Sequence, residues 1–342
     1  MKATPIGRPA RPGRGRVRIA AGCAVAAMLL AGCSAFGGSS ASGSAPAGSS
    51  ITVAAVPGVG DAPLYVAWQQ GLFRQHGLTV HLHSYQTMGQ VMAALHSGQA
   101  NVAVGDYADF FYEQESHVSQ PMVVLADGYD AAPNIMDILV SPNSPITTPK
   151  GLQGKRIGTV APQVMPVGVN APYSIDTVAA SSALENDGLQ PNLVKWVPMP
   201  ANQLVTALRT HRVDAILVTE PQIFEAESQI GARTILDACS GQTVNLPLDG
   251  YFAPSSFAQK HRSDLLAFRS AMIRAQADAV QPAPLEAVLR HYAGMTRETA
   301  ALITVGQYPT ALKVTSLQRV ADLMSFYGAL GHPLVVSRML LP

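Results

Sequence analysis

Two stretches of the chain decide the fold: residues 94–107 read ALHSGQANVAVGDY, and residues 207–221 read ALRTHRVDAILVTEP. In both, the end of an amphipathic helix leads through a turn to Asn or Asp, and an apolar run typical of a buried strand follows. Each run leads to a carboxylate, Asp106 or Glu220, just before a new helix is expected. Unless two ordinary amphipathic helices match by chance, this repeat predicts two lobes built on one plan.

Short strands and helices alternate around the repeat. Residues 51–56 predict a strand, residues 57–60 a turn rich in Gly and Pro, and residues 64–72 a helix with one apolar face. Units of this length indicate an α/β fold in which mainly parallel sheets are covered by helices on both faces. Such sheets bind ligands at the carboxyl ends of their strands, so two facing lobes would bring Asp106 and Glu220 to a shared cleft.

The amino terminus is predicted to be a targeting segment and a membrane anchor. Residues 1–32 hold six basic residues and no acidic one, and the apolar run 19–31 is shorter than the ~20 residues of a membrane span. This pattern is typical of a secretory signal peptide. The run ends in LAGC, residues 30–33, which resembles the lipobox of bacterial lipoprotein precursors and implies cleavage before Cys33 and a lipid on it. A plain signal peptide with an incidental cysteine is the alternative.

The composition of the remaining chain excludes one class of partner. Residues 33–50 are almost wholly Ser, Gly and Ala, which predicts a flexible tether. Beyond residue 32 the chain has 17 basic and 22 acidic residues and no basic cluster, which argues against a nucleic-acid partner. If Cys23 leaves with the signal and Cys33 carries lipid, Cys239 has no partner, so no intramolecular disulfide is expected.

Four groups of short motifs add a family resemblance. They are APLYVA, GLF and GL within residues 62–78, ALHSG at 94–98, KGLQGKRIG at 150–158, and DA and EP within 214–221. Together they resemble the substrate-binding proteins of nitrate, sulfonate and taurine ABC importers, which are related to thiamine-pyrimidine-binding proteins.

This resemblance implies a type II periplasmic-binding-protein fold, with two α/β lobes, a central cleft and two hinge crossings. Lobe one would comprise residues 51–140 and 251–342, and lobe two residues 141–250. The crossings would lie near Val140 and Tyr251.

The resemblance also implies a function. The protein would be a monomeric, lipid-anchored receptor on the outer face of the cytoplasmic membrane, delivering a small organic nutrient to an ABC permease and its ATPase. No catalytic residue, metal or cofactor is expected, and the Gly-x-Ser-x-Gly, His-Glu-x-x-His and phosphate-loop motifs are absent from the sequence. Two alternatives are an enzyme of the pyrimidine-synthase type on the same fold, whose cysteine-rich iron motif is missing, and a sensory or structural lipoprotein.

Candidate ligand-binding residues lie in loops at the expected strand ends. These loops carry carboxylates and aromatic rings but no Lys or Arg, which suits a neutral or cationic ligand such as an aminopyrimidine. Backbone amides at helix amino ends could instead hold a sulfonate, so both solute classes stay open. Helix capping is an equally open role for Asp61, Asp106, Ser174 and Glu220. The candidates are Asp61, Gln86, Thr87, Asp106, Tyr107, Gln163, Tyr173, Ser174 and Glu220.

Overall fold

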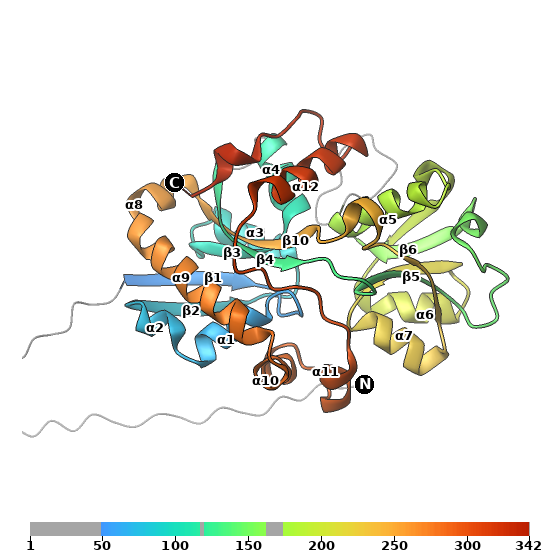
Figure 1. Cartoon of the computed structure of the whole chain (residues 1–342), viewed down its shortest axis with the longest axis horizontal. Helices are drawn as coiled ribbons and strands as arrows, with labels where there is room; N and C mark the ends of the chain where they lie inside the picture. Colours follow the sequence, from blue (N-terminus) through green and yellow to red (C-terminus); the bar gives the residue numbers. More distant parts are fainter. Residues whose placement is uncertain (1–48, 117–119, 162–173, 342) are drawn as a thin grey trace, which may run out of the picture. The chain divides into compact units, whose positions relative to one another are not determined.

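The computed structural model describes residues 49–116, 120–161 and 174–341, which form two five-stranded sheets with helices packed around them (Figure 1). The first sheet has the order β2-β1-β3-β10-β4. Its strands are β1 (Ser49–Ala55), β2 (Leu78–Ser84), β3 (Val102–Asp106), β4 (Met122–Asp130) and β10 (Pro247–Pro254). Strands β1, β2 and β3 are parallel, and β10 runs antiparallel to both β3 and β4.

The second sheet repeats this plan with the order β7-β6-β8-β5-β9. Its strands are β5 (Met136–Val140), β6 (Arg156–Val160), β7 (Lys195–Met199), β8 (Ala215–Thr219) and β9 (Arg233–Asp237). Strands β6, β7 and β8 are parallel, and β5 runs antiparallel to β8 and β9. The two-lobe α/β fold expected from the sequence is therefore confirmed, with the first sheet in lobe one and the second in lobe two.

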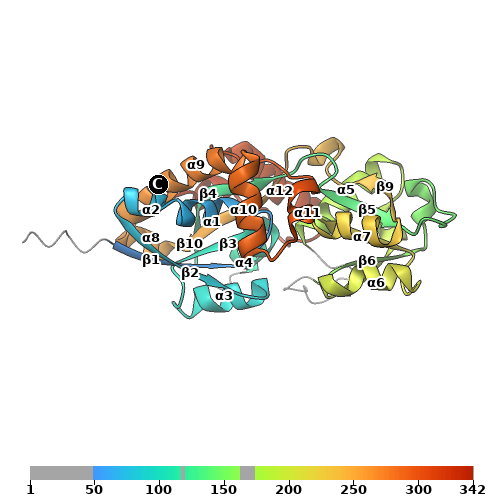
Figure 2. The same ribbon diagram turned by 90° about the horizontal axis from the view of Figure 1, so that it is seen from below.

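Helices cover both faces of each sheet, as the alternating pattern predicts. In Figure 2, α3 (Met88–His96) lies on one side of the first sheet, and α1 (Ala62–Gln69) and α9 (Arg262–Ala279) lie on the other. Lobe one also contains α2 (Leu72–Gln75), α4 (Tyr107–Ser116), α8 (Ser255–Lys260), α10 (Pro282–Tyr292), α11 (Arg297–Leu302) and α12 (Val314–Phe326). Lobe two contains α5 (Ile175–Asn186), α6 (Leu204–Arg209) and α7 (Gln222–Ile230). None of the described helices is long and apolar enough to cross a bilayer.

The sequence repeat corresponds to one hydrogen-bonding unit used in both lobes. In lobe one, the backbone N–H of Thr52 donates to Asn101 Oδ1 at 2.9 Å, and the N–H of Asn101 donates to the Thr52 carbonyl at 2.8 Å. In lobe two, the N–H of Arg156 donates to Asp214 Oδ2 at 2.8 Å, and the N–H of Asp214 donates to the Arg156 carbonyl at 2.9 Å. Each pair therefore ties the start of a repeat strand to its neighbour.

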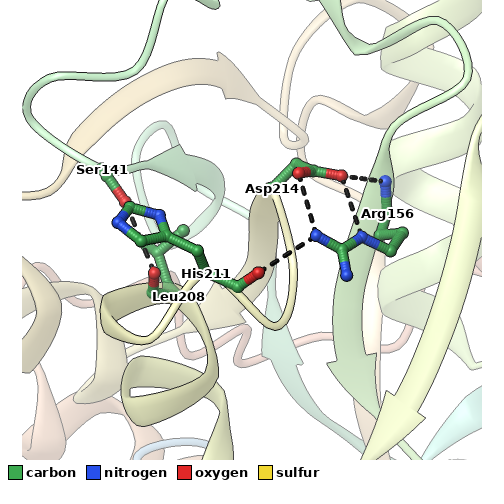
Figure 3. Close-up of polar contacts among 5 residues, drawn as sticks. All are labelled: Ser141, Arg156, Leu208, His211 and Asp214. Atoms are coloured by element: carbon green, nitrogen blue, oxygen red, sulfur yellow. Dashed lines mark hydrogen bonds and ion pairs between the residues drawn. The ribbon is translucent and has the colours of Figure 1, made fainter.

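Lobe two reinforces this unit with charge (Figure 3). The Arg156 guanidinium donates to both carboxylate oxygens of Asp214, each at 3.2 Å, and to the His211 carbonyl at 3.1 Å. The hydrogen bond from Arg156 lowers the pKa of Asp214. The charged pair thus fixes the turn between α6 and β8, as the neutral amide of Asn101 does between α3 and β3.

Both expected lobe boundaries are displaced. Val140 ends β5, which pairs only within the second sheet, so the chain first crosses between the lobes at residues 131–135. Tyr251 lies in the middle of β10, and the return crossing is residues 238–246. An apolar run identifies a strand but does not say which sheet it joins, which explains the displacement. The expected tether also ends early, because Ser49 and Ser50 pair with β2.

The carboxy-terminal segment contacts both lobes, although its sequence predicted packing on lobe one alone. From α12, the Arg319 guanidinium donates to the carbonyls of Val244 and Asn245, at 2.9 and 2.7 Å, in the second crossing. The Tyr327 hydroxyl, just after α12, donates to Glu185 Oε2 on α5 at 2.9 Å. The segment therefore links α12 to the second crossing and to lobe two.

Candidate functional site

A cavity of about 280 Å³ lies between the lobes, at the carboxyl ends of β1, β3 and β8. Lobe one contributes the loop after β1, including Gly60 and Asp61, the end of β3 at Asp106, and Asp249 on β10. Lobe two contributes Asp176 near the start of α5, Thr219 at the end of β8 and Glu220 just after it. This is the position that the strand-end rule predicts for a ligand crevice.

The cavity is acidic. Its lining includes five carboxylates and no Lys, Arg or His among the described residues. Burial disfavours the ionised form, so it raises the pKa of every one of these groups, to about 6 for Asp176 and about 7 for Asp249, whose pKa is also raised by Asp176. The five are Asp61, Asp106, Asp176, Glu220 and Asp249.

Asp106 and Glu220 are already held by backbone donors. Asp106 Oδ1 accepts the N–H of Ala108 at 2.6 Å in the first turn of α4, and Oδ2 accepts the N–H of Ile175 at 3.2 Å from lobe two. Glu220 Oε2 accepts the N–H of Phe224 in α7 and Oε1 accepts that of Thr304, both at 3.1 Å. The capping role that the sequence left open is thus present for both, and each carboxylate also reaches a distant segment of the chain.

Asp61 differs from these two, because it does not cap α1. Its residue is only 6% exposed, and its carboxylate has no hydrogen-bond donor among the described residues. Burial raises its pKa well above the usual value, and the negative charge of Asp249 raises it further. Sequence alone could not separate this uncapped carboxylate from the capped ones.

Asp249 was missed by the sequence analysis. It lies on β10, paired in register with Asp106, and no hydrogen bond reaches its carboxylate from the described residues. A Cβ placed on Gly60 would overlap Asp249 Oδ2, so a larger residue at this position of the loop after β1 would displace the Asp249 carboxylate. The available signal was a single acidic residue within the apolar run LPLDGYFAP, residues 246–254.

Three other candidates surround a neighbouring hollow of about 630 Å³, which shares Asp106 and Asp176 with the first cavity. Thr87 and Ser174 line it as the N-caps of α3 and α5, accepting from the N–H groups of residues 90 and 177 at 3.3 and 3.4 Å. Gln86 lines it from an exposed position. The two capping residues therefore have a structural role whether or not they touch a ligand.

Tyr107 is placed differently from its expected role. Its side chain is fully buried, its hydroxyl donates to Asp127 Oδ1 at 2.9 Å, and its ring fills the space beside Gly250. It lines neither hollow and belongs to the core of lobe one, because β10 packs over α4. The remaining candidates, Gln163 and Tyr173, lie outside the described residues, as does Cys33. No group of three or more His, Cys, Asp or Glu able to hold a metal occurs among the described residues.

Comparisons with known proteins agree with this architecture. The periplasmic aliphatic sulphonate-binding protein SsuA of Escherichia coli is 17% identical with a TM-score of 0.69, covering 86% of this chain and 97% of its own. The nitrate-binding protein NrtA of Synechocystis PCC 6803 is 14% identical with a TM-score of 0.64, covering 83% and 82%. The desulfurization enzyme DSZB, 17% identical with a TM-score of 0.65, covers 86% and 96%.

At these identities the structures establish the fold, and no curated protein sequence matches the chain. A family model described as NMT1/THI5 like matches residues 60–287, which is more than half of the chain. The resemblance seen in the sequence motifs is therefore confirmed, and the protein belongs to the NMT1/THI5-like family.

Proposed function

We propose that this protein is the extracytoplasmic solute-binding component of an ABC importer, which captures a small organic solute and delivers it to a permease. The observation that carries the proposal is the cavity of about 280 Å³ with walls from both lobes, which two chain crossings connect. Its volume lies just below the range of about 300–1,000 Å³ typical of sites for drug-sized ligands, which suits a small solute. The fold shared with SsuA and NrtA supports the same role.

Attachment through Cys33 is the second part of the proposal. A lipid on Cys33 would anchor the protein, as a monomer, to the outer face of the cytoplasmic membrane, within reach of a permease. Incorporation of labelled fatty acid tests it: the wild-type protein should carry the label and Cys33→Ser should not. The matched variant Cys23→Ser, within the expected signal peptide, should be labelled like the wild-type protein, and labelling of Cys33→Ser would refute the anchor.

A thermal-shift screen of protein purified from detergent-solubilised membranes tests solute binding. The compounds are taurine, alkanesulfonates, nitrate, pyrimidines, vitamins, and the small amines discussed below. A ligand at about 100 times its Kd should stabilise the folded state by about 2.7 kcal/mol. Absence of stabilisation by every class would refute the binding function.

Chromatography of the compound that binds separates a receptor from an enzyme. The enzyme alternative has one observation in its favour, since DSZB shares the fold. A receptor returns its ligand unchanged after prolonged incubation, whereas a new product that accumulates in proportion to protein concentration would establish catalysis.

A further inference from the structure

Three of the five carboxylates that line the interlobe cavity, Asp61, Asp176 and Asp249, have no hydrogen-bond donor among the described residues. Asp61 is almost fully buried and caps no helix, and Asp249 receives no hydrogen bond from the described residues. The absence of a Cβ on Gly60 leaves the space that Asp249 Oδ2 occupies. Asp249 is close enough for its negative charge to raise the pKa of Asp61, which burial already raises.

No cationic side chain among the described residues compensates the carboxylates of Asp61 and Asp249. The cavity lining contains no Lys, Arg or His among the described residues. The positive charges of Lys313 and Arg319 instead favour the ionised form of Asp130, which lies outside the lining. Buried carboxylates are normally paired or fully hydrogen-bonded, because removing a charge from water costs free energy. Asp106 and Glu220 satisfy this rule through backbone N–H groups. The buried Asp61 does not, and the half-buried Asp176 and Asp249 also lack a donor among the described residues.

An anionic solute would increase this imbalance. A sulfonate or nitrate in the cavity would add a negative charge beside five carboxylates, with no cationic side chain from the described lining. A cation instead supplies the missing partner, and a protonated amine or amidine also supplies the missing N–H donors. The cavity volume of about 280 Å³ suits a small molecule.

We infer that the cleft selects a small organic cation, held between the carboxylates of Asp61 and Asp249. The inference rests on the proposed solute-binding function and adds the charge of the solute. It distinguishes this chain from the sulphonate-binding and nitrate-binding proteins that share its fold.

Calorimetric titration of protein purified from detergent-solubilised membranes tests the inference. The probes are choline, putrescine and agmatine as cations, ethanesulfonate and nitrate as anions, and cytosine as a neutral ring. At least one cation should bind, and neither anion should. Asp61→Asn and Asp249→Asn should each weaken binding of that cation by about tenfold or more, whereas Asp187→Asn, at an exposed position after α5, should not.

Thermal unfolding of the empty variants separates a ligand contact from a structural role. Because Asp61→Asn removes repulsion from Asp249, the empty variant should melt at a higher temperature while binding the cation more weakly. A lower melting temperature with unchanged affinity would overturn the assignment of Asp61. Tighter binding of an anion than of any cation would overturn the inference and leave solute binding standing, whereas absence of binding in all three classes would overturn both.

Discussion

Asp249→Asn should make the empty protein more stable at alkaline pH and less sensitive to pH. Burial and the nearby charges of Asp176 and Asp109 raise the pKa of Asp249 from 3.8 to about 7 in the folded protein. The folded state therefore keeps a proton that the unfolded chain has already released. The stability that this proton provides is complete below about pH 4 and declines as the pH rises through 7.

The size of the effect follows from the two pKa values. The difference between the unfolded pKa of 3.8 and the folded pKa of about 7 lowers the free energy of unfolding by about 4 kcal/mol at a pH well above both values, relative to a pH well below them. Between about pH 5 and pH 8 the free energy of unfolding should fall by about 2.5 kcal/mol because of Asp249 alone. Asparagine has nearly the same shape and does not ionise, so this contribution disappears in the variant.

Urea denaturation at four pH values between about 5 and 8 measures the effect. Asp249→Asn should be more stable than the wild-type protein at each of these pH values, and the difference should grow as the pH rises. Equal slopes of the free energy of unfolding against urea concentration would show that the two proteins expose the same surface on unfolding. Asp187→Asn removes one exposed carboxylate and should follow the wild-type curve. Parallel pH profiles for wild type and Asp249→Asn would refute the reasoning.

Three further changes test individual contacts by denaturation. Gly60→Ala should cost about 1 kcal/mol or less because the Asp249 carboxylate can move away from the added Cβ, and Asp249→Ala in the same chain should remove that cost; a loss above about 3 kcal/mol would contradict this. Arg319→Met should cost about 1 kcal/mol, because water can replace the donor at these two exposed carbonyls of the second crossing, and an unchanged melting temperature would argue against that contact. Tyr327→Phe should cost about 1 kcal/mol and speed hydrogen exchange in α5 around Glu185, the acceptor it loses.

Most of the fold could be predicted from local patterns in the sequence. The repeat around Asn101 and Asp214 was readable because each side chain binds a neighbouring strand from a fixed place after a helix. The assignment of β5 to lobe two was not readable, since its partners β8 and β9 come from residues 215–237. Strand pairing depends on contacts distant in sequence, which an apolar run does not encode.

The candidate site was predictable in position but not in the roles of its residues. Strand ends brought Asp61, Asp106 and Glu220 to the cavity, as the periodicity indicates. Whether a carboxylate caps a helix depends on rotations of a few bonds, so Asp61 and Asp106 look alike in sequence and differ in the structure. Asp249 could not be placed because β10 enters the first sheet only after the chain returns from lobe two.

The cavity carboxylates have two opposite effects on how closely the two lobes approach each other. Asp106 accepts a hydrogen bond from the backbone N–H of Ile175 in lobe two. Glu220 accepts one from the N–H of Thr304, and the N–H of Gly306, two residues further on, donates to the Tyr129 hydroxyl in lobe one. These bonds favour apposed lobes, whereas repulsion among the ionised carboxylates of the cavity opposes them. A bound cation would remove much of that repulsion while leaving the bonds in place. Binding would therefore increase the fraction of molecules with apposed lobes. The size of this increase is set by the difference between the free energies with which the cation binds the apposed and the open state.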